Sequence, residues 1–171
     1  MTSIVRATQN DFKLLVNIGR QTFIESHGES AKKSAIDLYV NEKYNYAVLQ
    51  QELADLNNIY HIIYYEGQPA GYSKIILNTS HHNIQLQNIT KLERLYVVKD
   101  FYNLKLGLGL FKYNVELSKN SNQAGIWLFV WKENTRAVTF YLKNGFEITG
   151  SHDFKISETH SNPNHQMFLK Y

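Results

Sequence analysis

The 171-residue chain contains no cysteine, and this absence removes several classes of chemistry. Without thiols there is no disulfide, no thiolate zinc site, no Cys-x-x-Cys redox pair and no cysteine nucleophile. Proline is scarce as well, with two residues, and the nine glycines do not gather into a linker. Any catalysis must therefore use oxygen or nitrogen groups, and residues 1–171 are expected to fold as a single domain.

Long apolar runs and a strong charge of one sign are also missing. No stretch approaches the ~20 apolar residues that span a bilayer, and residues 1–12 lack the cationic and apolar blocks of a secretion signal. We therefore expect a cytoplasmic protein without a membrane partner. The net charge is only +3, and the aromatic residues do not alternate with clustered basic ones, so no nucleic-acid partner is expected. Residues 61–171 hold twelve basic and eight acidic side chains, which is where an anionic ligand is expected.

The seven histidines show no spacing typical of metal ligands, such as His-Glu-x-x-His. No metal site is therefore predicted. The histidines stand at positions 27, 61, 81, 82, 152, 160 and 165.

The apolar pattern predicts strands that alternate with helices. Helices are expected from the cap Asn10 to Phe23, over residues 33–41 and 45–56, from the Gly107–Gly109 loop to Lys119, and from Asn134 to Asn144-Gly145. Strands are expected over residues 3–7, 60–65, 70–77, 92–98, 126–130, 146–150 and 166–171. A four-residue turn over residues 66–69 would join the second and third strands, and residues 78–88 would form a loop. This order predicts an α/β fold with hairpin and crossover connections.

Glycines follow the strand over residues 92–98, where the chain enters the next helix. Gly107 and Gly109 stand in this region, and a glycine-containing turn at a helix N-terminus can present free N–H groups to a phosphate. The same glycines could instead serve a tight turn and close packing of the helix on the sheet. Both interpretations stay open at this point.

A second segment, residues 131–146, carries the pattern Asn-x-x-Ala-x-x-Phe-Tyr-x-x-x-Gly-Phe. The matching residues are Asn134, Ala137, Phe140, Tyr141, Gly145 and Phe146. Together with the first segment, it resembles the GNAT superfamily of N-acetyltransferases, over about residues 3–170. Within that superfamily the chain is most similar to the PaiA-like spermidine/spermine N-acetyltransferases.

The resemblance implies a GNAT-type fold and an acetyl-CoA co-substrate, with no metal. The fold would be a mixed, mostly antiparallel central sheet flanked by helices, with a parallel strand pair splayed around acetyl-CoA. In the ungapped alignment, Tyr102 occupies the Gln/Arg position of the family's Gln/Arg-x-x-Gly-x-Gly/Ala turn, Lys105 the first glycine and Gly107 the second. Lys105 adds a side chain where the backbone should approach phosphate, and it also offers that phosphate a charge. A shifted register would instead use Gly107 and Gly109 as the two glycines and would place Leu104 at the Gln/Arg position.

The resemblance also assigns roles to residues. Tyr141 would be the general acid that protonates the departing thiolate, with packing beside Phe140 as the alternative. Glu93 would accept the amine proton, or would be a surface carboxylate paired with Arg94 or Lys91. Asn134 would bind the cofactor, would cap a helix, or would do both. The implied cofactor-binding residues are Leu95, Tyr96, Val97, Tyr102, Asn103, Lys105, Leu106, Gly107, Leu108, Asn134 and Phe140.

The acceptor implied by the resemblance is a small primary amine, with a polyamine first. A polycation would favour carboxylates, but Glu25, Glu29, Asp37 and Glu42 alternate with lysines along the N-terminal helices. An amino acid, an aminoglycoside or a protein N-terminus are the alternative acceptors. A catalytically weak acyl-CoA sensor on the same fold is the alternative function, and a homodimer is left open.

Overall fold

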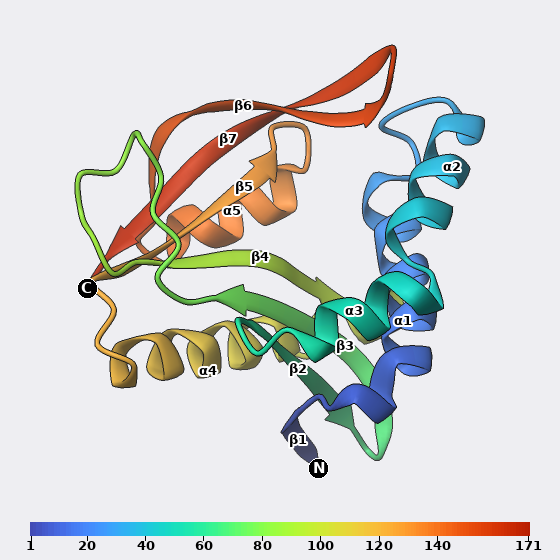
Figure 1. Ribbon diagram of the computed structural model, residues 1–171, viewed down its shortest axis with the longest axis horizontal. Coiled ribbons are helices and arrows are strands. Elements are labelled where there is room, and N and C mark those ends of the chain that lie inside the picture. Colours follow the sequence, from blue (N-terminus) through green and yellow to red (C-terminus); the bar gives the residue numbers. More distant parts are fainter. The chain divides into compact units, whose positions relative to one another are not determined.

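A computed structural model describes residues 1–171 (Figure 1). Its elements follow the predicted order of strands and helices. They are β1 (Thr2–Arg6), η1 (Gln9–Asp11), α1 (Phe12–His27), α2 (Lys33–Lys43), α3 (Tyr46–Ala54), β2 (Asn58–Tyr65), β3 (Gln68–Ile76), β4 (Thr90–Val97), η2 (Lys99–Phe101), α4 (Leu106–Asn120), β5 (Gly125–Trp131), α5 (Thr135–Lys143), β6 (Glu147–Ser157) and β7 (His160–Lys170).

The seven strands form one sheet in the order β1-β2-β3-β4-β5-β7-β6. The pairs β1–β2, β5–β7 and β6–β7 are antiparallel, whereas β4 and β5 are parallel. The registered parallel pairing is short, because it joins only Thr90 to Ile126 and Lys91 to Trp127. The predicted mixed, mostly antiparallel sheet with one parallel pair is confirmed. No helix is both long and apolar enough to cross a membrane.

The chain forms two compact units. The N-terminal unit contains residues 1–75 and 94–114, and the C-terminal unit contains residues 76–93 and 115–171. The predicted single domain over residues 1–171 stays a prediction.

In the N-terminal unit, the apolar face of α4 packs on the strands. Leu106 and Leu110 are buried against Ile63 of β2 and Ala70 of β3, with Leu95 beside them. Helices α2 and α3 each pack against α1 (Figure 1). The start of α4 is therefore anchored on β2 and β3, beside the end of β4.

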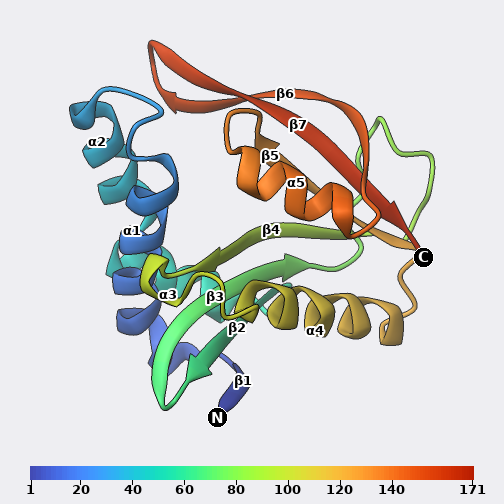
Figure 2. The ribbon, with the colours of Figure 1, turned by 180° about the vertical axis from the view of Figure 1, so that it is seen from behind.

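In the C-terminal unit, α5 and the connection over residues 77–89 lie on opposite faces of β5 and β7 (Figures 1 and 2). A Cβ on Gly145, just after α5, would come 3.3 Å from Leu169, which pairs with Ile126. The opposite face carries Trp127, which is 3% exposed and packs with Ile84 and Ile89 of the connection.

Four sequence-based expectations were wrong in detail. The turn between β2 and β3 has two residues, Glu66 and Gly67, because both adopt positive φ (50° and 79°), the geometry of a tight hairpin. Asn10 does not cap α1, because it lies inside η1, which Thr8 caps in a reciprocal pair with Asp11. Gly107 and Gly109 lie inside α4 and not in a loop.

The fourth error concerns the last two strands, which are far longer than expected. Strand β6 covers Glu147–Ser157 and β7 covers His160–Lys170. Most of β6 is exposed, and residues 149–153 in its middle contain no large apolar side chain that would indicate a strand. Pairing with β7, and not a buried face, makes this segment a strand.

Candidate active site

The chain passes from β4 into α4 through a turn fixed by hydrogen bonds. Phe101 N donates to Val98 O (2.9 Å), and Tyr102 N donates to Lys99 O (3.0 Å). The Lys99 N–H donates to the Glu25 Oε2 atom at 2.8 Å, which ties the turn to α1. The turn is therefore held in place before any ligand arrives.

Asn103 and Lys105 adopt the left-handed backbone conformation in this turn, with φ of 70° and 59°. Glycine adopts this conformation at little cost, whereas a lysine is strained by its Cβ. Lys105 is the residue that the ungapped alignment places at a family glycine. The backbone thus supports the ungapped alignment over the shifted alignment that uses Gly107 and Gly109.

Lys105→Gly is expected to raise the free energy of unfolding by up to about 1 kcal/mol. The left-handed conformation costs an L-residue roughly 1–2 kcal/mol, and the extra freedom of glycine in the unfolded chain offsets part of that gain. Lys112→Gly, at an exposed position inside α4, is the matched control and should lower stability by about 1 kcal/mol. Urea unfolding of both variants checks the opposite signs, and loss of stability in Lys105→Gly would contradict the strain.

The first turn of α4 presents backbone N–H groups. The first hydrogen bond of the helix runs from Gly109 N to Lys105 O (3.1 Å). The N–H groups of Leu106, Gly107 and Leu108 come before it and have no acceptor within the helix. A Cβ on Gly107 would make ordinary contact with Val97 (3.5 Å), and a Cβ on Gly109 would meet nothing within 4 Å. Packing therefore requires glycine at neither position. This excludes the interpretation that the two glycines serve close packing of the helix on the sheet.

The side chains at the end of β4 point to opposite faces of the strand. Leu95 and Val97 pack toward α4. The Tyr96 ring lies 5.8 Å from Tyr72 and 6.2 Å from His27, measured between centroids. Burial lowers the pKa of His27 to about 4, so its imidazole is neutral at pH 7.

In the C-terminal unit, α5 places Tyr141 between two aromatic rings. Its ring lies edge-on to Phe140 and Phe146, both at 5.3 Å between centroids, and the residue is 8% exposed. Burial raises the pKa of Tyr141 well above the ordinary value of 10, so the phenol stays protonated. Asn134 caps the helix as predicted, accepting from Ala137 N at 3.2 Å.

Glu93 is exposed on β4. Arg94, one of its two suggested cationic partners, forms an ion pair with Glu52. Lys91, the other, lies over the rings of Trp127 and Phe129.

The chain matches the acetyltransferase (GNAT) family over residues 21–146. It belongs to the GNAT family. A Lactobacillus delbrueckii subsp. lactis protein named "uncharacterized N-acetyltransferase in pepI 3'region" is 25% identical over 155 residues, which are 91% of this chain and 90% of that protein. This GNAT protein is therefore an N-acetyltransferase.

Solved GNAT structures share the fold. The PaiA N-acetyltransferase from Thermoplasma acidophilum, in complex with coenzyme A, has a TM-score of 0.79 at 20% identity, covering 100% of this chain and 99% of that one. The ribosomal-protein-S18-alanine N-acetyltransferase from Escherichia coli has a TM-score of 0.72 at 13% identity, covering 99% and 94%.

The two units divide the candidate GNAT residues between them. The N-terminal unit brings together the strand end and the turn, with Leu95, Tyr96, Val97, Tyr102, Asn103, Lys105, Leu106, Gly107 and Leu108. The C-terminal unit contains Glu93, Asn134, Phe140 and Tyr141. No group of three or more His, Asp or Glu side chains is arranged to hold a metal ion.

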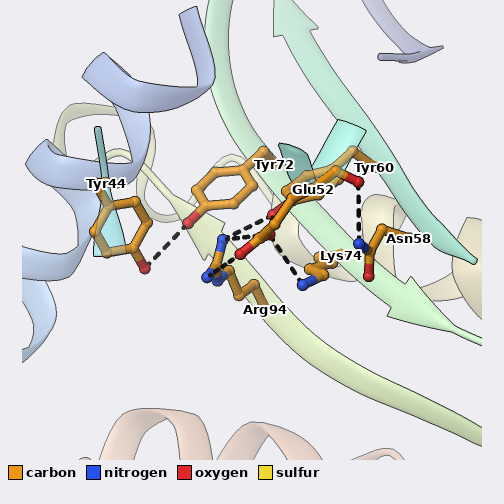
Figure 3. A network of polar contacts seen from close by, with 7 residues as sticks. All are labelled: Tyr44, Glu52, Asn58, Tyr60, Tyr72, Lys74 and Arg94. Carbon is orange, nitrogen blue, oxygen red and sulfur yellow. Dashed lines mark hydrogen bonds and ion pairs between the residues drawn. The ribbon is translucent and has the colours of Figure 1, made fainter. Parts of the chain in front are cut away.

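Sequence reasoning missed a buried polar network in the N-terminal unit (Figure 3). Glu52 of α3 accepts from Lys74 Nζ (2.9 Å), from Arg94 Nη1 and Nη2 (both 3.4 Å), and from the Tyr60 hydroxyl. The Arg94 guanidinium also donates to Tyr60 Oη (2.8 Å) and lies 5.0 Å over the Tyr44 ring. A lysine within the Ile- and Tyr-rich strand over residues 70–77 was the available signal.

Proposed function

We propose that this N-acetyltransferase moves the acetyl group of acetyl-CoA to the primary amine of a small molecule. The start of α4 carries the proposal: three N–H groups precede the helix bonding, beside Lys105 and two glycines that packing does not need. Glycine inside a helix costs roughly 1 kcal/mol relative to alanine, so its use there favours close approach of a ligand to the backbone. Phosphate oxygens suit that arrangement.

The residues present fit acetyl-CoA, which when bound supplies the activated acetyl thioester. The turn residues and the first turn of α4 would hold the pyrophosphate: Tyr102, Asn103, Lys105, Leu106, Gly107 and Leu108. The backbone of Leu95, Tyr96 and Val97 would pair with the pantetheine arm. Asn134 and Phe140 are proposed as further cofactor-binding residues.

Two side chains would handle the protons of the transfer. A new C–N bond forms while the C–S bond breaks, so the amine must lose a proton and the departing sulfur must gain one. Glu93 is proposed to take the amine proton, directly or through water. Tyr141 is proposed to hold a proton at Oη for the sulfur, since its burial keeps the phenol neutral.

Lys105→Ala is expected to weaken acetyl-CoA binding by about 1–3 kcal/mol, the range for hydrogen bonds to charged groups. Lys105→Gly should recover part of that loss, because it relieves the left-handed backbone. Calorimetric titration with acetyl-CoA measures both variants, with Lys112→Ala as the control. Parent-like binding by both Lys105 variants would exclude a phosphate role for this lysine.

The function itself is tested by thiol release and mass spectrometry with a panel of amines. Spermidine and spermine are included because of the PaiA-like resemblance, which one 20% identical neighbour supports. Among the carboxylates suggested for a polycation, Glu25 accepts from Lys99 N, and Asp37 pairs with Lys33. Acetyl-CoA binding without thiol release from any amine would favour the acyl-CoA sensor, which the departures at Tyr102 and Lys105 keep as the second candidate. No binding at millimolar acetyl-CoA would exclude both.

A further inference from the structure

One surface of the C-terminal unit combines aromatic rings with basic nitrogens. We call it the histidine–lysine surface, formed by His81, His82, Lys91, Trp127, Phe129 and His152. His81 lies 4.9 Å from Trp127 and 5.7 Å from Phe129, measured between ring centroids. His152 stacks on Phe129 at 4.1 Å, with 17° between the ring planes.

The four basic groups of this surface have no carboxylate partner. Lys91 Nζ lies 5.4 Å from the Trp127 centroid and 6.0 Å from the Phe129 centroid, and it forms no ion pair. His81 accepts from Asn83 N (3.3 Å), and its ring lies 4.3 Å from that of His82, with 31° between the ring planes. Burial, and then the charges of His82, His152 and Lys91, lower the pKa of His81. The Lys91 cation attracts an anion, and the imidazole nitrogens beside it add hydrogen-bonding groups.

The histidine–lysine surface is built on a fixed frame. Trp127 Nε1 donates to Thr79 O at 2.8 Å, which fastens the connection over residues 77–89 to β5. Asn78 N donates to Gln123 Oε1, and Gln123 Nε2 donates to Asn78 Oδ1, both at 2.9 Å. The basic groups therefore stand on a preorganised aromatic floor, which reduces the cost of binding a ligand there.

This surface adjoins the proposed proton acceptor. Lys91 and Glu93 are two residues apart on β4, so they stand on the same face of the strand, with Cα atoms about 7 Å apart. A group a few atoms from an amine that gives its proton to Glu93 is within reach of Lys91. The Lys91 cation would repel a polycation there.

We propose that the acceptor carries an anionic group, carboxylate or phosphate, beside its primary amine, and that Lys91, His81 and His152 receive that group. The inference rests on the proposed function and narrows its substrate to amino-acid-like or phosphorylated amines. Polyamines are disfavoured, in contrast to the acceptor that the sequence resemblance implies.

Matched amines that differ only in the anionic group test the proposal. Lysine is compared with cadaverine, histidine with histamine, phenylalanine with phenethylamine, and O-phosphoethanolamine with ethanolamine. Product formation by mass spectrometry gives kcat/KM for each at saturating acetyl-CoA. In at least one pair, the anionic member is expected to exceed its partner about ten-fold or more, as for a hydrogen bond to a charged group. The phosphate pair separates the two kinds of anion.

Lys91→Met removes the charge but keeps an apolar stem of similar size over Trp127. It should lower kcat/KM about ten-fold for the anionic member and leave the neutral-tailed member within about two-fold. Lys13→Met is the matched control, because Lys13 Nζ also lies over a ring, 5.8 Å from Phe12, in the N-terminal unit. Thermal unfolding verifies that both variants fold.

The outcomes separate this inference from the proposed function. Acetylation of amines with no preference for the anionic members, or turnover of spermidine and spermine alone, overturns the inference and leaves the N-acetyltransferase function standing. A parent-like preference in Lys91→Met also overturns it. If acetyl-CoA binds but no amine of any pair is acetylated, the proposed transfer fails, and the inference fails with it.

Discussion

Tyr141→Phe is expected to lower kcat about 100-fold while leaving acetyl-CoA affinity nearly unchanged. The substitution removes only the hydroxyl, so the edge-on contacts with Phe140 and Phe146 persist. Because burial raises the pKa of Tyr141, the parent phenol keeps its proton across the whole neutral and mildly alkaline range. Deprotonation of Tyr141 should therefore not reduce kcat between about pH 7 and 9.5. The measurement is kcat over that range with the best amine of the panel.

Tyr171→Phe is the matched control for this prediction. Burial, followed by the charge of Glu116, raises the pKa of Tyr171 to about 12, so this control also removes a phenol that stays protonated at neutral pH. It should leave kcat within about two-fold. If Tyr141→Phe loses cofactor affinity and kcat in equal measure, the hydroxyl serves packing and not proton donation.

Glu52→Gln is expected to lower the free energy of unfolding by about 3–5 kcal/mol. The Arg94 side chain is 11% exposed and has Glu52 as its carboxylate partner, so the variant would leave a buried guanidinium without a counter-charge. Lys74, 5% exposed, loses its 2.9 Å contact to the same carboxylate. Urea unfolding measures the loss. Glu158→Gln is the control, because its pair with Lys155 is exposed and should contribute less than about 1 kcal/mol.

The same network gives stability a defined dependence on pH. Burial opposes ionisation of Glu52, but Arg94, Lys74 and the Tyr60 hydroxyl outweigh it, so the pKa of Glu52 lies below the ordinary value of 4.5. The contribution of the carboxylate is therefore fully present above pH 4.5 and is lost as pH falls through the lower pKa of the folded state. The parent should lose this stability in acid, while Glu52→Gln should not. Parallel curves for the two proteins below pH 4.5 would contradict the network's role.

Local signals in the sequence predicted much of the fold and of the candidate residues. Asn134 caps α5 and Gly145 takes a positive φ of 90° after it, and both follow from short-range chemistry. The GNAT pattern over residues 134–146 is likewise local, because it spans only α5 and its two caps. The roles of Tyr141, Glu93 and Lys105 stay predictions, because they concern a bound substrate.

The sequence by itself determined which segments are helices and how strands and helices follow one another along the chain, since spacing and caps act within a few residues. Its motifs also indicated the family. Tertiary structure alone decided the length of β6, the left-handed backbone of Lys105 and the burial of Lys74 and Arg94 around Glu52. It also decided that His81 and His152, 71 positions apart, share one surface with Lys91. The physical reason is that charges and rings act through space, so their partners are fixed only when distant segments pack together.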